Sequence, residues 1–209
     1  MLFVETIVCG PLENNVYVVF DDETFEALVI DPSIGTESVF TFIQRKNLAV
    51  KQILITHAHF DHFYGVPYLM KMIPTIQSVL LHKRDHTQWQ TGGGAKKFTG
   101  FHLEVEAPLR FVKDGEIILF GQHTCEVSSA PGHSAGSVIY YFPELKSAFV
   151  GDVIFFHGIG RTDLDDGNTS QLLDSIRKKV FTLPDDTILH PGHGPTTSVL
   201  EEKTNNPFL

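Results

Sequence analysis

Residues 56–62 read Thr-His-Ala-His-Phe-Asp-His, and this stretch decides how the rest of the chain is interpreted. Three of the eleven histidines and one aspartate lie within it. The apolar run Ile53–Ile55 comes directly before it and is typical of a short buried strand. Imidazole and carboxylate groups bind zinc, iron and manganese, so this strand end is a candidate metal-binding loop.

The spacing within the stretch suggests two neighbouring metal positions. In an extended segment, residues two apart point to the same side, so His57 and His59 can reach one ion together. Asp61 and His62 follow the turn and are expected to face a second position close by.

Three later segments repeat the same pattern of an apolar run that ends in a glycine-containing turn. The candidate ligand in each turn is His133 after residues 126–129, Asp152 after residues 147–150, and His193 after residues 187–189. Glycine allows the backbone to approach an ion closely or to adopt a positive φ. Strand ends that converge on one edge of a sheet form the sites of many α/β proteins.

These four motifs, in this order, resemble those of the metallo-β-lactamase superfamily. They are His-x-His-x-Asp-His, Pro-Gly-His, Gly-Asp and Pro-Gly-His-Gly, and the resemblance runs from Asn14 to the C-terminus. Residues 151–155, 160–163 and 201–209 are similar to a short, single-domain branch of the glyoxalase II-like, or hydroxyacylglutathione hydrolase-like, enzymes. The resemblance implies an α/β fold, a four-layer αβ/βα sandwich, formed as one domain over residues 1–209.

The resemblance also implies a ligand set. The first metal would be bound by His57, His59 and His133, and the second by Asp61, His62 and His193, with Asp152 bridging the two. Asp61 and Asp152 would be the catalytic carboxylates. True β-lactamases of this fold commonly carry a cysteine at the position of Asp152, so antibiotic hydrolysis is not expected. Zinc is the expected metal at both sites, while iron and manganese accept the same ligands.

The expected reaction is hydrolysis of a thioester such as S-D-lactoylglutathione by a hydroxide that bridges the two metals. Metal binding brings the pKa of water toward neutrality, and a thiolate leaves without much acid assistance. Longer glyoxalase II enzymes carry an extra C-terminal helical region that helps to hold glutathione, and the chain ends at Leu209 without one. Arg161 could bind a carboxylate of the thiol moiety, or it could pair with Asp163 or Asp165.

Three other functions compete with this interpretation. Persulfide dioxygenases share the metal motif and the Arg-Thr-Asp segment, and would use one iron held by His57, His133 and Asp152. A binding module with structural zinc is disfavoured because structural sites are usually rich in cysteine. A nuclease of this fold would be expected to carry basic surfaces or nucleic-acid-binding insertions.

Composition narrows the partners and the compartment. The chain has 209 residues, 42% of them hydrophobic and 20% charged, as in an ordinary globular protein. A formal net charge of −9 argues against nucleic acid as a partner, and the expected partner is a small-molecule thioester. Cys9 and Cys125 stand far apart and are expected to be reduced thiols of a cytoplasmic protein. No signal peptide or membrane-spanning stretch is evident, and the oligomeric state stays open.

The pattern predicts strands and helices in both halves of the chain. Strands are expected at residues 2–8, 16–20, 25–30, 51–55, 78–81, 111–112, 117–120, 124–128, 137–142, 148–150 and 187–189. Helices are expected at residues 36–46, 63–73, 82–90 and 169–180. The glycine-rich segment 91–97 is expected to be a mobile edge of the substrate cleft.

Overall fold

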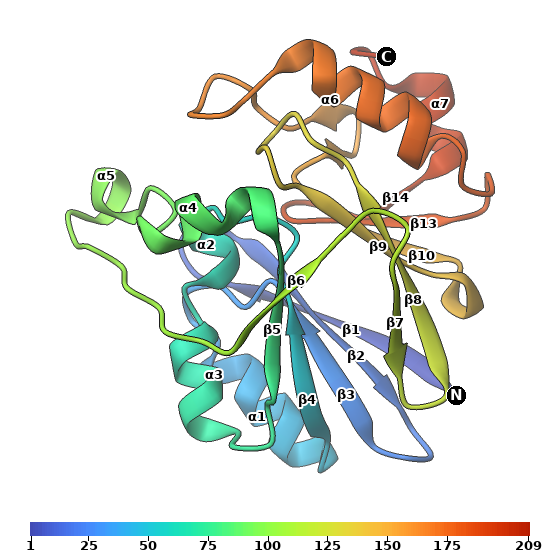
Figure 1. Cartoon of the computed structure of the whole chain (residues 1–209). Helices are drawn as coiled ribbons and strands as arrows, with labels where there is room; N and C mark the ends of the chain where they lie inside the picture. The colour runs from blue at the N-terminus through green and yellow to red at the C-terminus, as the bar shows by residue number, and fades with distance from the viewer.

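The computed structural model describes residues 1–209, which form two six-stranded β-sheets with helices on their outer faces (Figure 1). The first sheet has the strand order β1-β2-β3-β4-β5-β6 and the second the order β14-β13-β10-β9-β8-β7, while β11 and β12 form a separate hairpin. The predicted four-layer αβ/βα sandwich is confirmed.

The first sheet comes from the first 112 residues of the chain. Its strands are β1 (Leu2–Cys9), β2 (Asn14–Asp21), β3 (Glu26–Ile30), β4 (Ala49–Leu54), β5 (Ser78–His82) and β6 (Leu109–Val112). The first three strands are antiparallel neighbours, whereas β3, β4, β5 and β6 run parallel. The carboxyl ends of β3, β4 and β5 therefore lie at one edge of this sheet.

The second sheet comes from the C-terminal half. Its strands are β7 (Ile117–Phe120), β8 (His123–Ser129), β9 (Val138–Phe142), β10 (Ser147–Gly151), β13 (Ile188–Pro191) and β14 (Thr197–Ser198). The hairpin strands are β11 (Ile154–Phe155) and β12 (Gly158–Ile159). Strands β10 and β13 are parallel, and β8 runs in the same direction because both β8 and β10 are antiparallel to β9.

The side chains of each strand alternate between the two faces of its sheet, and this alternation separates the layers of the core. All eight residues of β2 are buried. Val16, Val18 and Phe20 pack on the helix side of the first sheet, while Tyr17 and Val19 face the second sheet. Because successive side chains point to opposite faces, a strand covered on both sides is apolar on both faces, as β2 is from Val16 to Phe20.

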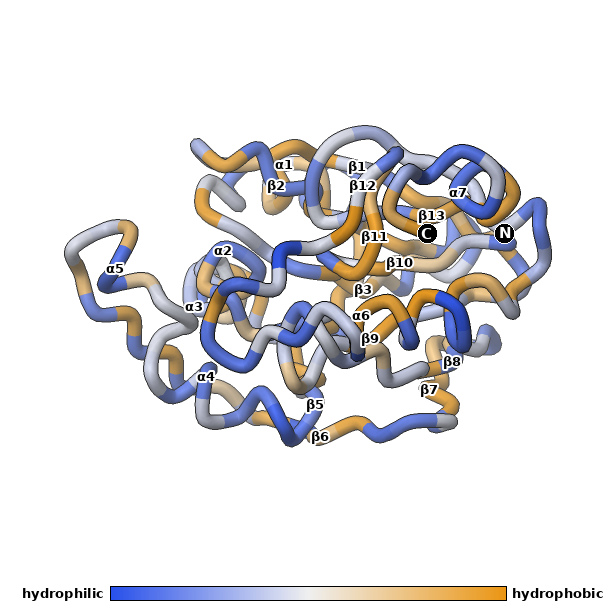
Figure 2. Tube along the Cα trace, turned by 90° about the horizontal axis from the view of Figure 1, so that it is seen from above, coloured by the Kyte–Doolittle hydropathy of each residue, from blue (hydrophilic) through white to orange (hydrophobic).

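The helices cover the outer faces of the two sheets. They are α1 (Glu37–Lys46), α2 (Phe60–Phe63), α3 (Val66–Met72), α4 (His86–Gln90), α5 (Ala95–Thr99), α6 (Thr169–Ser175) and α7 (Val199–Asn205). Helices α1 and α3 pack on the first sheet through Val39 and Leu69, and α6 packs on the second through Leu172. Seen from above, α5 lies at the outer edge of the molecule, beyond α4 (Figure 2).

Several helices differ from the predicted ones. The predicted helix 63–73 is observed as α3, which begins only at Val66, while Phe63 ends the separate helix α2. The amide of Gly65 donates its hydrogen bond to the carbonyl of Pro32 rather than to a helical carbonyl, and this interrupts the helix there. The predicted helix 169–180 ends in a π-helical turn, Ile176–Val180. Short 3₁₀ turns, η1 (Lys83–Asp85) and η2 (Pro143–Leu145), follow β5 and β9, and helices α5 and α7 were not predicted.

None of the helices combines the length and the hydropathy that a bilayer-crossing segment needs.

Candidate metal centre

All seven side chains predicted as metal ligands lie at the strand ends where the two sheets meet. His57 and His59 follow β4, and Asp61 and His62 are on α2. His133 lies between β8 and β9. Asp152 directly follows β10, and His193 follows β13. Their ligand atoms fall into three overlapping groups: His57, His59 and His133; His57, His62 and Asp152; and Asp61, His62 and His193.

The first group is three buried histidines whose nitrogens converge. His133 Nε2 lies 3.1 Å from His57 Nε2 and 2.8 Å from His59 Nδ1. Nitrogens bound to one tetrahedral zinc ion are about 3.3 Å apart, given Zn–N distances of about 2.0–2.1 Å. The spacing of these three nitrogens therefore resembles that of a zinc-binding set.

Hydrogen bonds at the opposite ring nitrogens select the tautomers. The Nδ1–H of His133 donates to the carbonyl of Arg161 at 2.8 Å, and that of His193 donates to the carbonyl of Leu12 at 2.9 Å. The Nδ1–H of His62 donates to Asp31 at 2.9 Å. Each bond leaves the Nε2 lone pair free to face the centre, as ligand histidines require.

Asp61, His62 and His193, called the second group from here on, combine one carboxylate with two histidines. Asp61 Oδ2 lies 3.6 Å from His62 Nε2 and 3.4 Å from His193 Nε2. It also accepts a hydrogen bond of 2.9 Å from the side-chain amide of Asn14. A carboxylate between two imidazoles suits a divalent cation, because the carboxylate offsets part of the cation's charge and the imidazole nitrogens add uncharged donors.

Asp152 stands between the two groups. Its Oδ1 lies 3.5 Å from His62 Nε2, and its Oδ2 lies 3.6 Å from His133 Nε2 and 3.8 Å from His193 Nε2. The carboxylate therefore reaches histidines of both groups. This is the position that a ligand shared by two cations would occupy.

The polar atoms of the centre are not satisfied by the protein alone. Asp152 Oδ1, His59 Nε2 and His62 Nε2 are buried and have no hydrogen-bond partner. Buried polar atoms without partners are rare in folded proteins, and bound ions are one explanation for them. Together with the nitrogen and oxygen donor set, these orphan atoms fit a metal centre.

The electrostatics of the centre also suit cations. Burial lowers the pKa of His57 and lowers that of His59 to about 3, so both are neutral ligands at neutral pH. Burial also disfavours the charge of His62, but Asp61, Asp152 and Asp31 outweigh it and raise the pKa of His62 to about 10. A proton is thus favoured at a position that a cation could take instead.

Gly192 shows how closely the backbone approaches this centre. A Cβ atom at this position would lie 2.3 Å from Asp152 Oδ1 and 2.6 Å from the His62 ring. Any side chain there would displace two candidate ligands. The glycine next to His193 is therefore required by space, as the sequence pattern indicated.

The residues that support the ligands were not predicted from the sequence. Asp31 accepts hydrogen bonds from the amide and hydroxyl of Thr56, at 2.7 and 2.6 Å, in addition to that from His62. The Thr56 hydroxyl lies 3.1 Å from His57 Nδ1. The sequence did contain one signal for this role: Asp31 directly follows β3, whose parallel neighbour β4 leads into the loop that carries His57.

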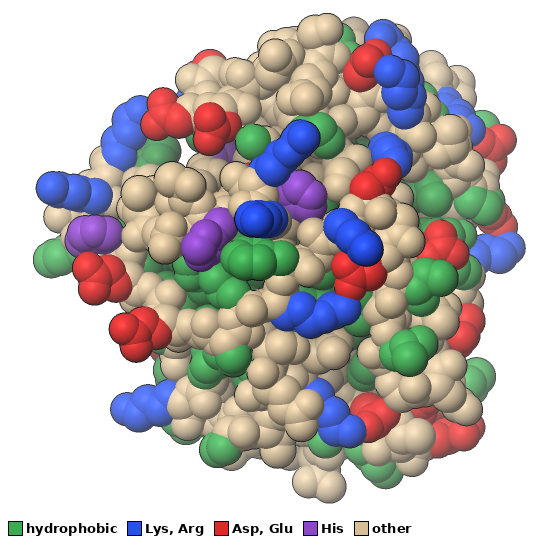
Figure 3. Space-filling model, viewed as in Figure 1, with side chains coloured by type: hydrophobic (Ala, Val, Ile, Leu, Met, Phe, Trp, Pro, Cys, Tyr) green, Lys and Arg blue, Asp and Glu red, His purple; other side chains and the backbone are tan.

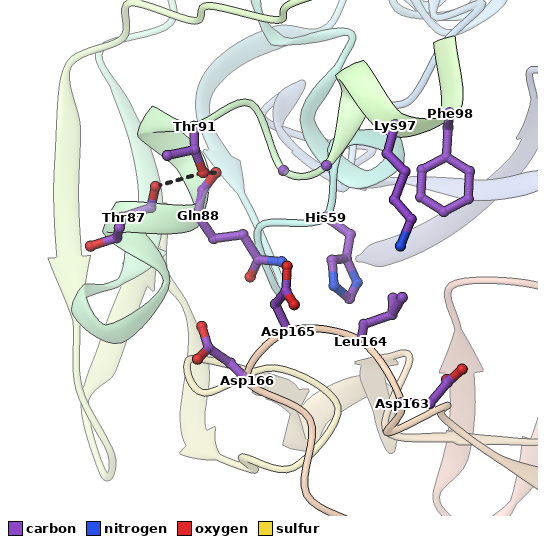
Figure 4. A pocket seen from close by; sticks show the side chains of 12 residues that line it. His59, Thr87, Gln88, Thr91, Lys97, Phe98, Asp163, Leu164, Asp165 and Asp166 are labelled. Atoms are coloured by element: carbon purple, nitrogen blue, oxygen red, sulfur yellow. Dashed lines mark hydrogen bonds between the residues drawn. The ribbon is translucent and has the colours of Figure 1, made fainter. Parts of the chain in front are cut away.

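A cavity of about 340 Å³ opens over the centre. Apolar side chains of Leu12, Phe60, Phe98 and Leu164 line it together with five of the candidate ligands. It continues into a more polar cleft, where Lys97 and Phe98 of α5 and Leu164 of the facing loop point in around His59 (Figure 4). Segment 91–97 thus contributes to the edge of the cleft, while its predicted mobility stays a prediction.

Arg161 also lines the cavity, and its guanidinium pairs with Asp163. Its Nε and Nη2 donate to the two carboxylate oxygens of Asp163, both at 2.7 Å. Of the two roles considered for Arg161, the structure therefore contains the ion pair with Asp163. The same residue serves the centre through its backbone, since its carbonyl fixes the ring of His133.

The remaining histidines near the motifs lie outside the centre. His190 Nε2 lies 3.1 Å from Ser147 Oγ, and its ring stacks on Phe149 within the second sheet, so it supports no candidate ligand. His157 Nε2 lies 2.7 Å from Glu201 Oε1 on α7.

Comparison with known proteins gives a family match over most of the chain. A family model described as the metallo-beta-lactamase superfamily matches residues 9–197. The "probable metallo-hydrolase YqgX" of Bacillus subtilis is 37% identical over 206 residues, which cover 96% of this chain and 94% of that protein. Hydroxyacylglutathione hydrolase GloC of Haemophilus influenzae is 34% identical and covers 99% of this chain and 97% of its own length.

Two further kinds of protein are also similar. The human mitochondrial persulfide dioxygenase ETHE1 is 32% identical over 92% of this chain and 70% of its own length. Among solved structures, the BLEG-1 B3 metallo-beta-lactamase has a TM-score of 0.93 at 36% identity and covers 99% of both chains. TTHA1623 in a di-iron-bound form has a TM-score of 0.88 at 35% identity and covers 99% of this chain and 100% of its own.

Proposed function

The chain belongs to the metallo-β-lactamase superfamily, and we propose that it is a metal-dependent thioester hydrolase acting on a substrate such as S-D-lactoylglutathione. The observation that carries the proposal is the convergence of seven His and Asp side chains, with buried orphan atoms among them, under an apolar cavity. Its similarity to hydroxyacylglutathione hydrolase over nearly the full length supports the thioester substrate.

In this proposal the seven side chains hold two divalent cations. His57, His59 and His133 bind the first, Asp61, His62 and His193 bind the second, and Asp152 is shared. Zinc or iron fits this donor set, and one similar structure contains two iron ions. When bound, the cations polarise the substrate carbonyl and lower the pKa of water so that hydroxide is available near neutral pH.

The chain's own residues orient the ligands and the substrate. The carbonyls of Arg161 and Leu12 and the carboxylate of Asp31 hold three imidazole rings in the tautomer that faces the centre. Leu12, Phe98 and Leu164 enclose the space over Asp61 and Asp152 and exclude water around the acyl group. Hydrolysis adds water to the acyl carbon and breaks its bond to sulfur, and the thiolate leaves and takes up a proton from solvent.

Persulfide dioxygenase activity is the second candidate, because the human enzyme of that name is 32% identical to this chain. That activity would require a single iron ion held by His57, His133 and Asp152. The convergence of Asp61, His62 and His193 favours the hydrolase, because these three side chains offer a second metal position beside the first.

The deciding experiment measures three reactions with the purified protein. We expect thiol release from S-D-lactoylglutathione that requires zinc or iron and disappears after treatment with a chelator. Oxygen uptake with a low-molecular-weight persulfide, without thiol release, would contradict the proposal and assign the dioxygenase. The similarity to a B3 metallo-beta-lactamase makes a β-lactam the third substrate, and its hydrolysis in place of the thioester would also contradict it.

We further propose a small-molecule substrate and a cytoplasmic location. Cys9 and Cys125 are both buried and unpaired, and burial raises the pKa of Cys125 well above its ordinary value, which suits an inert reduced thiol. Acidic and basic side chains are interspersed on the face in Figure 3, and the net charge is −9. This surface does not favour a nucleic-acid backbone.

A further inference from the structure

Asp85 is a buried carboxylate next to the centre that belongs to neither ligand group. It ends the 3₁₀ turn η1, and only 1% of its surface is exposed. Its Oδ2 accepts hydrogen bonds of 2.8 Å from the amide of Ala58 and of 2.8 Å from the hydroxyl of Ser134. Its Oδ1 accepts one of 2.5 Å from the amide of Gly136. Burying a carboxylate is costly, and these three donors offset that cost.

The donors connect Asp85 to all three ligands of the first group. Ala58 lies between His57 and His59, and Ser134 directly follows His133. The first two histidines belong to the loop after β4, in the first sheet, whereas His133 belongs to the loop between β8 and β9, in the second. One carboxylate thus holds together two loops that come from different sheets.

The second ligand group is supported by other residues. Asp61 accepts a hydrogen bond from Asn14, His62 donates to Asp31, and His193 donates to the carbonyl of Leu12. Asp85 makes no hydrogen bond to any of these residues. Its removal is therefore expected to disturb one group and to spare the other.

We propose that Asp85 is a positioning residue that sets the geometry of the first metal site, an inference that rests on the proposed two-metal centre. A metal ion requires its ligand atoms at defined separations, and here these separations depend on how the two loops lie relative to each other. Substituting a partner that orients metal ligands typically lowers metal affinity tenfold to one hundredfold.

The test is Asp85→Asn, which keeps the shape of the side chain and removes its charge. Both carboxylate oxygens of Asp85 accept hydrogen bonds, whereas an asparagine amide has only one acceptor oxygen. The NH₂ group of the variant must therefore face a donor, and that donor loses its hydrogen bond. Protein stripped of metal is titrated with zinc against a chelating competitor, so the readout needs no substrate. We expect one of the two equivalents to bind about 10–100 times more weakly and the other to keep its affinity.

Two further variants keep the test decisive. Ser134→Ala removes one donor and leaves the carboxylate in place, so we expect a smaller loss at the same single equivalent, even if Asp85→Asn folds poorly. Asp114→Asn is the matched control, because Asp114 also accepts a backbone amide, that of Ser129, but is exposed and paired with Lys179. It should bind both equivalents as the unsubstituted protein does.

The outcomes separate this inference from the proposed function. Unchanged affinity for both equivalents in Asp85→Asn and Ser134→Ala would overturn the role of Asp85 alone. Equal weakening of both equivalents would show a general structural role and would also overturn it. Failure of the unsubstituted protein to bind two equivalents would instead overturn the two-metal centre itself.

Discussion

At the scale of single residues, the chemistry of the centre depends on which nitrogen of each histidine is free. The sequence predicted the seven ligand candidates, because residue type, strand ends and glycine turns are local features. It did not predict their supports. Asp31 and Asn14 reach His62 and Asp61 only because β2, β3 and β4 are neighbours in one sheet, and strand order is not written in any short segment.

Asp152→Ala tests the shared carboxylate. We expect activity and metal retention to be lost together, while the metal-free protein stays folded, because Asp152 Oδ1 has no partner in the protein. Saturating metal should raise the Tm of the unsubstituted protein by about 5–10 °C, and this rise should disappear in the variant. Differential scanning fluorimetry measures it. Full activity of Asp152→Ala would rule out the shared role, and Asp174→Ala on the surface of α6 is the control.

At the scale of elements, periodicity predicted most strands and the helix α1, whereas tertiary contacts decided the rest. The predicted helix 63–73 begins only at Val66, because the amide of Gly65 bonds to the carbonyl of Pro32. Helix α7 was missed, although Ser198 caps it by accepting from the amide of Glu201. Its pattern is weak because its fully buried residues include the charged Glu202.

Glu202 attaches α7 to the hairpin beside the cleft, and its loss should destabilise the protein. Its carboxylate accepts hydrogen bonds from the amide of His157, the hydroxyl of Thr197 and the side-chain amide of Asn206. Glu202→Ala leaves these donors unpaired, so we expect the free energy of unfolding to fall by roughly 2–4 kcal/mol. Urea denaturation measures the change. In the control Glu201→Gln, the half-buried neighbour keeps an oxygen that can accept from His157 and Asn205, so it should alter the free energy of unfolding by less than about 0.5 kcal/mol. Equal effects of the two variants would refute this argument.

At the scale of the whole molecule, two sheets from the two halves of the chain place their strand ends on one centre. The alternation of strand groups with helices predicted two sheets packed face to face with helices outside, and the family resemblance predicted the same architecture. The sheets are also joined at the end opposite the centre, where His123 of β8 bonds to Asp21 of β2 and to Glu144, both at 2.6 Å.

The charged junction formed by His123, Asp21 and Glu144 should make the free energy of unfolding depend on pH. Burial disfavours the imidazolium, but bonds to Asp21 and Glu144 raise the pKa of His123, and the bond to His123 lowers the pKa of Asp21. The stabilisation from His123 is therefore complete below its unfolded pKa of about 6.5 and is lost as pH rises through its folded pKa. The stabilisation from Asp21 is present above about pH 3.9 and is lost as pH falls through its lowered pKa.

Urea unfolding of His123→Gln and the unsubstituted protein at pH 6 and pH 9, without metal, tests this junction. We expect the variant to be less stable at pH 6 and the difference to shrink at pH 9. A difference that does not change between the two pH values would contradict the charged junction.

The most direct test of the two-metal centre is anomalous diffraction from crystals of the metal-loaded protein. We predict two peaks about 3.5–4 Å apart, one within reach of His57, His59 and His133, the other within reach of Asp61, His62 and His193, and Asp152 contacting both. A single peak bound by His57, His133 and Asp152 at full occupancy would contradict the two-metal hydrolase and favour the mononuclear dioxygenase.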